Sequence, residues 1–264
     1  MKTYVIHYDK LKHRKESLEL QLKQNDLNAD WLIQKGFYSK EFIDKYFKFS
    51  VSEWKRKVRI AKRPIIYRPL TKSEIHLTIN HFLVGERISR GEDDIALVFE
   101  DDAVLIDNFK EVFRDVLKQL NKATWDIAYL DFLGGKPPKV DKLTLLDHRN
   151  DNDYYGTCAY LIKRSTWNQI LAMNEKFTLP SDEELKYRIN HLGLKSVWIL
   201  PPLVKQSSLN GLDNADSGQD QREIQGIKRY IFWRKKIYKI FPRKVRDTID
   251  TIEEKIKKLI LGIN

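Results

Sequence analysis

The sequence predicts an α/β fold with a mostly parallel central sheet. β-Branched and aromatic runs alternate along the chain with segments in which apolar residues recur at helical spacing. The run at residues 94–99 is almost continuously apolar, which is typical of a central strand that is covered on both faces. The chain has 264 residues, 42% of them hydrophobic, which is enough to bury a sizeable core.

The first half of the chain contains four predicted elements. Residues 3–8 are β-branched and aromatic and predict the first strand. A helix is expected over residues 14–24, and a mixed, basic stretch follows to about residue 70. Thr71 and Glu74 have the spacing of a capping box, so we expect a helix to begin there. The next strand is the apolar run itself.

The second half continues the same alternation of helices and strands. Gly and Pro at 134–138 predict a loop, and residues 207–220, rich in Ser, Asn, Gly and Asp, predict another. The predicted elements are a helix at 109–120, strands at 126–130 and 157–162, a helix at 165–173, a helix from residue 180 and a strand at 197–200.

Charge and composition limit the possible functions. The formal net charge of +11 is concentrated in residues 226–264, which hold 12 Lys or Arg against 4 Asp or Glu, and in residues 40–68, which hold 10 against 3. Such patches indicate local anionic partners or solvated faces. The single cysteine, Cys158, excludes a disulfide scaffold and a cysteine-rich zinc module. With no long apolar run and no signal-peptide profile at the N-terminus, the sequence predicts a cytoplasmic protein.

Three consecutive acids, Glu100, Asp101 and Asp102, follow the apolar strand. Ligands of open α/β sheets bind at the carboxyl ends of the strands, which is where these side chains are expected. Their mutual repulsion favours a bound cation, and hard divalent ions share carboxylate oxygens with substrate phosphates. A solvated acidic turn explains the three acids alone equally well.

In combination with other segments, the triplet resembles a motif of glycosyltransferase family 25, the lipooligosaccharide and lipopolysaccharide glycosyltransferases. The resemblance spans residues 3–206. The matching segments are Val5-Ile6-His7-Tyr8-Asp9 with Arg14, Leu70 to Ile75 with Asn80-His81, Ala96 to Ala103, Trp125 to Leu130, Tyr155 to Ile162, Pro180-Ser181-Asp182 and Pro201 to Gln206. The chain departs from the family pattern at positions that concern the nucleotide contacts and the choice of donor. These are His7, Ser73, His76, Leu77 and Asn80.

The resemblance implies a GT-A-type nucleotide-sugar-binding domain over residues 1–220. It also implies an inverting transfer from a UDP-sugar, with UDP-galactose as the first candidate, to a lipopolysaccharide, lipooligosaccharide or other surface-glycan acceptor. The acidic motif of such enzymes corresponds to Glu100 and Asp102, which would hold Mn²⁺ or Mg²⁺, and Glu100 and Asp101 would also contact the donor. The metal would stabilise the leaving diphosphate.

The reaction also needs a carboxylate that activates the acceptor hydroxyl. Asp182 is our candidate for this base, and Glu183 is the alternative. Either acid can instead serve only to offset the helix dipole.

Five further residues are candidates for donor binding, namely Arg14, His81, Gly156, Thr157 and Gln206. Gly156 and Thr157 would let backbone and ligand approach closely. Arg14 is equally consistent with a surface position, and His81 with a buried, hydrogen-bonded histidine. Glu74 needs no role beyond its capping box.

Residues 221–264 form a basic tail in which aromatics alternate with Lys and Arg. This composition favours a helical, amphipathic segment on the anionic inner face of a membrane, where a lipid-linked acceptor would be found. Nucleic-acid binding has the same charge signature, but no nucleic-acid motif accompanies it, so no nucleic-acid partner is expected. The competing hypothesis for the whole chain is a catalytically silent module that binds the membrane surface.

Overall fold

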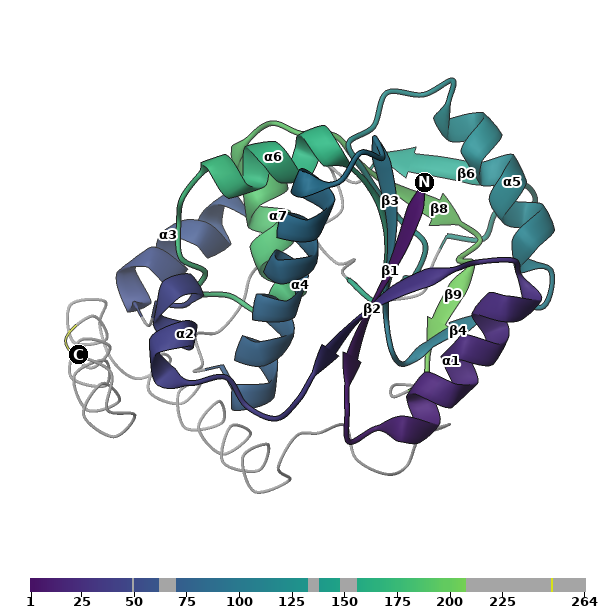
Figure 1. Cartoon of the computed structure of the whole chain (residues 1–264). Helices are drawn as coiled ribbons and strands as arrows, with labels where there is room; N and C mark the ends of the chain where they lie inside the picture. Colours follow the sequence, from purple (N-terminus) through teal and green to yellow (C-terminus); the bar gives the residue numbers. More distant parts are fainter. Residues whose placement is uncertain (49, 62–69, 133–137, 148–155, 208–247, 249–264) are drawn as a thin grey trace, which may run out of the picture.

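The computed structural model describes residues 1–48, 50–61, 70–132, 138–147, 156–207 and 248. The described chain forms three layers, with a sheet between two groups of helices (Figure 1). This is the α/β architecture predicted from the alternation of strands and helices.

Within the described ranges, the central sheet has seven strands in the order β2-β1-β3-β7-β5-β8-β6. Five of them run in one direction, and β7 and β6 run antiparallel to their neighbours, so the sheet is mostly parallel as expected. The strands are β1 (Lys2–Tyr8), β2 (Ala29–Gln34), β3 (Ile95–Glu100), β5 (Ile127–Tyr129), β6 (Thr144–Asp147), β7 (Ala159–Lys163) and β8 (Ser196–Leu200). From β1 the chain goes to β2 on one side and later returns to β3 on the other side, so a topological switch point lies at these strands.

In the described part of the chain, five helices cover one face of the sheet. They are α2 (Lys40–Tyr46), α3 (Val51–Ile60), α4 (Lys72–Arg90), α6 (Arg164–Ala172) and α7 (Ser181–His191). Their apolar sides and the alternate residues of the strands, such as Ala96 and Val98, form one hydrophobic core. Helix α4 begins with the predicted capping box: the Thr71 side chain accepts from the Glu74 backbone N–H, and the Glu74 side chain accepts from that of Thr71.

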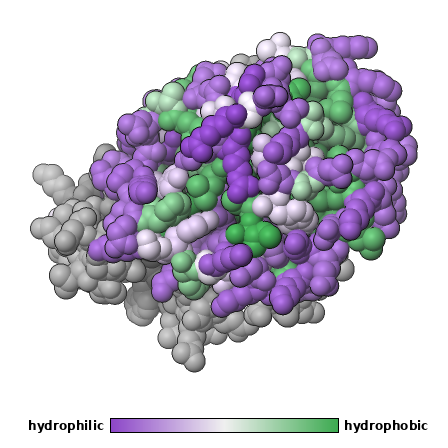
Figure 2. Space-filling model, viewed as in Figure 1, coloured by the Kyte–Doolittle hydropathy of each residue, from purple (hydrophilic) through white to green (hydrophobic). Residues whose placement is uncertain are grey.

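Helices α1 (Lys12–Gln24) and α5 (Phe109–Leu120) cover the opposite face. They pack Leu18, Leu22, Phe109 and Phe113 against the other alternate residues of β3, including Leu97, in a second core. In the space-filling view, the edge of the molecule over these two helices is mostly hydrophilic (Figure 2). Each helix therefore presents one apolar side to the sheet and one polar side to solvent.

Two short strands, β4 (Ala103–Leu105) and β9 (Val204–Gln206), pair antiparallel outside the main sheet. They were not predicted, and neither were β2, β6, α2 and α3. These elements are short or carry many polar residues, so neither a continuous apolar run nor strict alternation marks them. The predicted strand at 157–162 begins two residues later than expected, and it runs antiparallel to β3 and β5.

The predictions for the two basic patches, residues 221–264 and 40–68, are tested to different extents by the structure. The tail at 221–264 lies outside the described residues except for Thr248, as do most of the predicted loops at 134–138 and 207–220. In the 40–68 patch, a solvated face is wrong for Lys57, which is completely buried. Its ammonium group lies 2.7 Å from the Glu184 carboxylate of α7 and serves the packing of α3 on α7. In the part of the chain that is described, no helix is both long and apolar enough to cross a membrane.

Candidate functional site

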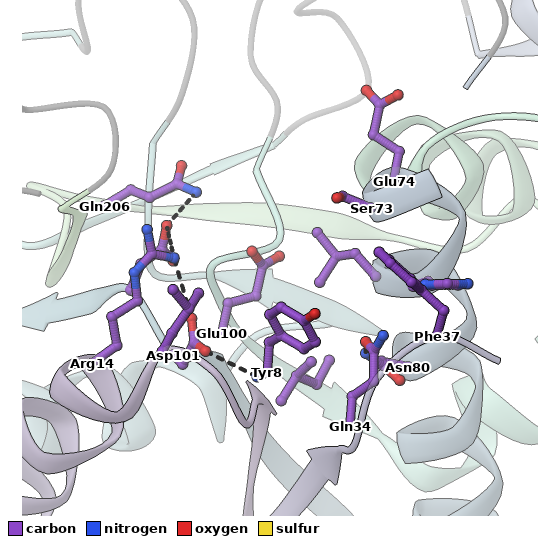
Figure 3. Close-up of a pocket in the computed structure, with 15 residues that line it drawn as sticks. Tyr8, Arg14, Gln34, Phe37, Ser73, Glu74, Asn80, Glu100, Asp101 and Gln206 are labelled. Atoms are coloured by element: carbon purple, nitrogen blue, oxygen red, sulfur yellow. Dashed lines mark hydrogen bonds and ion pairs between the residues drawn. The ribbon is translucent and has the colours of Figure 1, made fainter. Parts of the chain in front are cut away.

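A cavity of about 220 Å³ opens at the carboxyl ends of β1, β2 and β3. It is lined by Tyr8 and Gln34 from the first two strands and by the acidic triplet that ends the third (Figure 3). This is the edge of an open α/β sheet, next to its switch point, where ligands bind. The predicted location of the triplet is therefore confirmed.

The Asp101 carboxylate is engaged by three groups from the start of the chain. Its Oδ2 lies 2.8 Å from His7 Nδ1 and 3.1 Å from the Tyr8 backbone nitrogen. Its Oδ1 lies 3.4 Å from an Arg14 guanidinium nitrogen in the first turn of α1. Asp101 therefore joins the end of β1 to α1 and holds Arg14, which is itself buried, beside the cavity.

The Glu100 carboxylate accepts hydrogen bonds from two buried side chains. Its Oε1 lies 2.7 Å from the Thr157 hydroxyl and 3.1 Å from His81 Nε2. The other nitrogen of His81 lies 3.0 Å from the Tyr160 hydroxyl. A carboxylate only accepts hydrogen bonds, so His81 donates to Glu100 from Nε2. Both bonds use Oε1, and the Glu100 side chain lines the cavity (Figure 3).

The Asp102 carboxylate meets the strand pair β4 and β9. Gln206 Nε2 donates to its Oδ2 over 2.9 Å, and Cys158 Sγ lies 3.6 Å from its Oδ1. Arg14 is 4.0 Å from the same Oδ2. The structure therefore places Gln206, predicted from its position after the last strand, next to the acidic triplet and at the cavity.

Asp131 is a buried acid that the sequence analysis missed. Its carboxylate accepts long backbone hydrogen bonds from Cys158 and Ala159. Burial, and then the charge of Glu100, raises the pKa of Asp131 well above its usual value. Gly156 has a positive φ, and a Cβ there would stand 2.2 Å from Asp131 Oδ2, so only glycine fits. The sequence could have indicated Asp131, because it directly follows an apolar run, as Glu100 does.

The first turn of α7 reaches the acidic triplet through Thr157. The Ser181 hydroxyl lies 3.2 Å from the Thr157 hydroxyl, which in turn donates to Glu100. Asp182 follows Ser181. Burial raises the pKa of Tyr129 on β5, and the negative charges of Asp131 and then Asp182 add to this shift. Asp182 Oδ1 also accepts from the Glu183 backbone nitrogen over 2.9 Å. Neither acid lines the cavity as the described residues define it.

The half of the cavity away from Arg14 is aromatic. Phe37, after β2, lies opposite Arg14 and Gln206 (Figure 3). His76 in α4 packs against Phe37, with ring centroids 4.8 Å apart, and against Tyr38 at 5.3 Å. Burial, and then the charge of Lys72, lowers the pKa of His76 to about 4. The imidazole is therefore neutral near pH 7.

This low pKa predicts a pH-dependent stability that a His76→Phe variant lacks. The folded-state pKa of His76 is about 4 and the unfolded one is about 6.5, so between these values the unfolded chain binds more protons. The contribution of His76 is complete above pH 6.5 and is lost as the pH falls to 4. We expect urea unfolding at pH 7, 5.5 and 4 to show wild type losing roughly 1–3 kcal/mol more than His76→Phe. Parallel pH profiles would contradict the prediction.

The carboxylate oxygens of the acidic triplet are suitable ligands for a hard divalent cation. The negative charge of the triplet is already partly offset by hydrogen bonds and by Arg14. No group of three or more His, Cys, Asp or Glu side chains converges as in a complete metal site within the described ranges. Mg²⁺ is commonly held by one or two carboxylates and completed by phosphates and water. Glu100 and Asp102 supply two carboxylates at the cavity, while Asp101 is turned toward His7 and Arg14.

The chain is similar to one curated protein over part of its length. A curated bovine (Bos taurus) protein, "Probable inactive glycosyltransferase 25 family member 3", is 30% identical over 127 residues. The match covers 46% of this chain and 21% of the bovine protein, so the chain spans about a fifth of that relative's length.

Two solved structures are similar only at a distance. One is a Bacillus anthracis protein assigned as a glucose-1-phosphate thymidylyltransferase, in complex with sucrose. It is 11% identical, with a TM-score of 0.38 over 78% of this chain and 89% of that one. The other is the inositol-1-phosphate CTP transferase of T. maritima, 8% identical, with a TM-score of 0.39 over 75% and 84%.

The family comparison covers most of the chain. The model for glycosyltransferase family 25, described as an LPS biosynthesis protein, matches residues 1–185. The matched part includes Arg14, His81, the acidic triplet, Thr157 and Asp182, whereas Gln206 lies beyond it. The order of segments in the sequence, the acidic edge of the sheet and this match agree, and the chain belongs to glycosyltransferase family 25.

Proposed function

We propose that the chain is an inverting, divalent-metal-dependent glycosyltransferase with a GT-A-type donor site. It would transfer a sugar from a UDP-sugar, first of all UDP-galactose, to a lipopolysaccharide, lipooligosaccharide or other surface-glycan acceptor. The observation that carries the proposal is the cavity at the carboxyl edge of β1, β2 and β3, where acidic side chains lie beside a buried arginine. In a family 25 chain, this arrangement suits a diphosphate bound together with a cation.

Glu100 and Asp102 are the residues that would hold Mn²⁺ or Mg²⁺. The ion would offset the charge of the leaving diphosphate. Arg14 supports the same task from the protein side, because its guanidinium is fixed by Asp101 and borders the cavity. His81 and Thr157 orient Glu100 by hydrogen bonds to its carboxylate, and Gln206 orients Asp102 in the same way. These contacts preorganise both carboxylates before the donor arrives.

Asp182 is the proposed base. It would accept the proton of the acceptor hydroxyl as that oxygen attacks the anomeric carbon and the bond to the diphosphate breaks. The contact chain from Ser181 through Thr157 to Glu100 places the start of α7 at the same edge of the sheet as the donor site. Glu183, on the same helical turn, is the alternative base.

The acceptor and the membrane are the remaining partners. A family of lipopolysaccharide biosynthesis proteins works on glycans that are built on lipid. The basic tail at 221–264 would hold the enzyme at the anionic inner face of the membrane, within reach of such an acceptor. This part of the proposal rests on the sequence alone.

The function is tested by a donor screen on the full chain. Isothermal titration of UDP-galactose, UDP-glucose and free UDP, each with Mn²⁺ and with EDTA, should show binding that the metal strengthens. In Asp102→Asn we expect the metal-dependent part, about tenfold or more in affinity, to disappear. Asp107→Asn, the same change at an exposed acid, is the matched control and should bind like wild type. Undiminished binding by Asp102→Asn with EDTA present would remove the metal role.

The name of the bovine relative, a "Probable inactive" family member, favours one alternative, a catalytically silent membrane-surface binding module with the same fold. Release of free sugar from the bound UDP-sugar during long incubation separates the two. Slow hydrolysis that requires Asp182 supports the enzyme, whereas intact donor and no transfer to any glycan acceptor would favour the silent module.

A further inference from the structure

His76 is a buried side chain with unsatisfied hydrogen-bonding groups at the cavity. It is 3% exposed, and neither Nδ1 nor Nε2 has a hydrogen-bond partner among the described residues. A buried polar atom without a partner usually reduces stability. His76 is one of the positions at which the chain departs from the family motif that its sequence resembles.

Phe37 is the second unusual residue of this half. Its side chain is 59% exposed although it borders the cavity and packs against His76. An exposed aromatic ring next to a neutral imidazole offers a flat surface on which another ring can stack. Leu77 adds an apolar wall.

The other polar groups here are largely engaged with one another. Asn80 donates to Gln34 over 2.7 Å and accepts from the Tyr38 hydroxyl over 2.6 Å. Gln34 also donates to the Gly36 carbonyl over 2.8 Å. Of the described residues that line this half, only His76 has buried polar side-chain atoms without any partner.

We propose that Phe37 and His76 form the subsite for the heteroaromatic base of the nucleotide donor, with Phe37 stacking on the base and His76 hydrogen-bonding to its edge. The inference rests on the proposed function and deepens it. It makes His76 a residue that determines which base is accepted, with uracil as the preferred ligand.

The two halves of the cavity differ in chemistry, and this difference indicates which half would bind the base and which the diphosphate. A diphosphate is drawn to Arg14 and to a cation on the acidic triplet, not to a neutral imidazole beside Glu74. A neutral imidazole carries one N–H donor and one acceptor nitrogen, so it can match either the carbonyl or the imide N–H of uracil. Sugar hydroxyls would need several open polar groups, and the amides of Gln34 and Asn80 already bind each other.

The test uses titration calorimetry on the full chain with Mn²⁺, and UDP, CDP, ADP and pyrophosphate as probes. Wild type should prefer UDP. Phe37→Leu should weaken UDP binding about 5- to 150-fold, the range for loss of base stacking. His76→Phe should weaken it roughly tenfold and reduce the preference for UDP over CDP and ADP, and His76→Gln should restore part of both. Pyrophosphate, which has no base, should bind all variants equally.

Stability distinguishes this role from a structural one. Since His76→Phe removes two unpaired buried polar atoms, its melting temperature near pH 7 should equal or exceed that of wild type. The matched controls are His191→Phe at the exposed end of α7 and Leu20→Ala on α1, and both should bind UDP like wild type. Unchanged UDP affinity and base preference in His76→Phe and Phe37→Leu would overturn the subsite alone. Absence of nucleotide binding by wild type would overturn the proposed function as well.

Discussion

Replacement of Asp182 by Asn is expected to reduce the kcat of sugar transfer about 10²- to 10⁴-fold, the usual contribution of a general base. The affinity for the UDP-sugar should change little, because Asp182 lies on α7 and is not among the residues that line the donor cavity. Asn keeps the Oδ1 acceptor that binds the Glu183 backbone nitrogen, so the helix start should remain intact. Single-turnover transfer and donor titration together measure both quantities.

The matched control is Glu183→Gln, because Glu183 is the next residue and lies in the same first turn. If both acids served only to offset the helix dipole, each variant would lose a similar 0.3–1 kcal/mol, roughly, and keep most of its activity. A base at Asp182 instead predicts that activity is lost in one variant and retained in the other. Loss of transfer only in Glu183→Gln would move the base to Glu183, and full activity in both variants would remove the assignment from α7.

The sequence allowed the central part of the fold to be predicted because local signals were strong there. Strand β3 is apolar up to Phe99, and α4 begins with a complete capping box, so both can be recognised without tertiary information. Strand β2 has a mixed pattern, and its place beside β1 depends on pairing that no local rule specifies. The antiparallel direction of β7 is likewise a property of the whole sheet.

For the candidate site, too, local sequence signals predicted single residues but not their contacts. Glu100, Asp101 and Asp102 could be selected because they follow a buried strand. Arg14, His81, Thr157 and Gln206 were also named as candidates, but the acid that each of them contacts could not be predicted. His7 was not recognised as a partner of Asp101, because the two residues are 94 positions apart in sequence. His76 appeared only as a departure from a family pattern, and its unpaired ring nitrogens became visible only when Phe37 and Tyr38 were placed around it.

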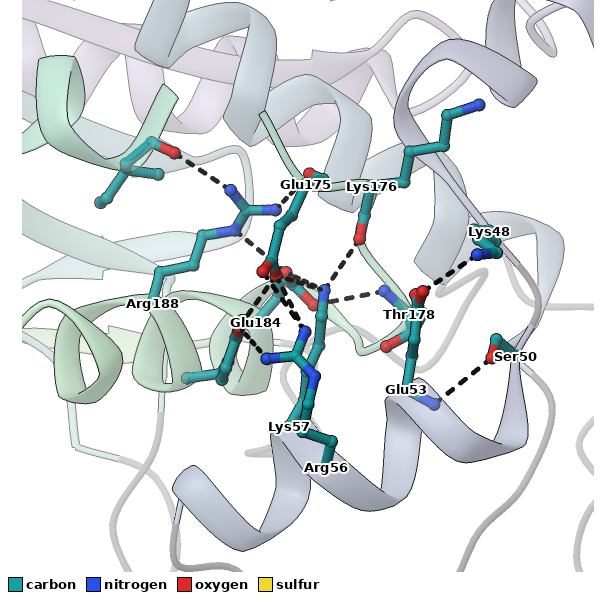
Figure 4. Close-up of polar contacts among 12 residues, drawn as sticks. Lys48, Ser50, Glu53, Arg56, Lys57, Glu175, Lys176, Thr178, Glu184 and Arg188 are labelled. Carbon is teal, nitrogen blue, oxygen red and sulfur yellow. Dashed lines mark hydrogen bonds and ion pairs between the residues drawn. The ribbon is translucent and has the colours of Figure 1, made fainter. Parts of the chain in front are cut away.

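The basic residues of 40–68 illustrate how charge counts mislead when burial is unknown. The sequence interpretation placed Lys57 on a solvated face, but its ammonium group is enclosed between α3 and α7 (Figure 4). It donates to the Lys176 carbonyl over 2.8 Å and pairs with Glu184 over 2.7 Å. Arg188, also buried, donates from Nε to the same carboxylate oxygen of Glu184 over 3.0 Å. One carboxylate thus compensates two buried cations.

Replacement of Glu184 by Gln is therefore expected to reduce the free energy of unfolding by about 3–5 kcal/mol, because it leaves the buried Lys57 and Arg188 without this counter-charge. Burial already lowers the pKa of Lys57, and Glu184 opposes that shift, so in the variant Lys57 should lose its proton more readily. The Gln amide has one acceptor oxygen, so it cannot accept from the Thr178 backbone nitrogen and from Lys57 and Arg188 together, and the loss includes hydrogen bonds as well as charge compensation. Urea unfolding at pH 7 gives the value.

Glu53→Gln is the matched control, because Glu53 pairs with Lys48 over 2.9 Å where both side chains are partly exposed. An exposed pair of this kind contributes about 0–1 kcal/mol, so the same chemical change should have little effect there. Equal losses in the two variants would show that Glu184 does not act as the counter-charge of a buried network. A large loss confined to Glu184→Gln would mean that part of the positive charge of the sequence holds α7, and with it Asp182, against the rest of the fold.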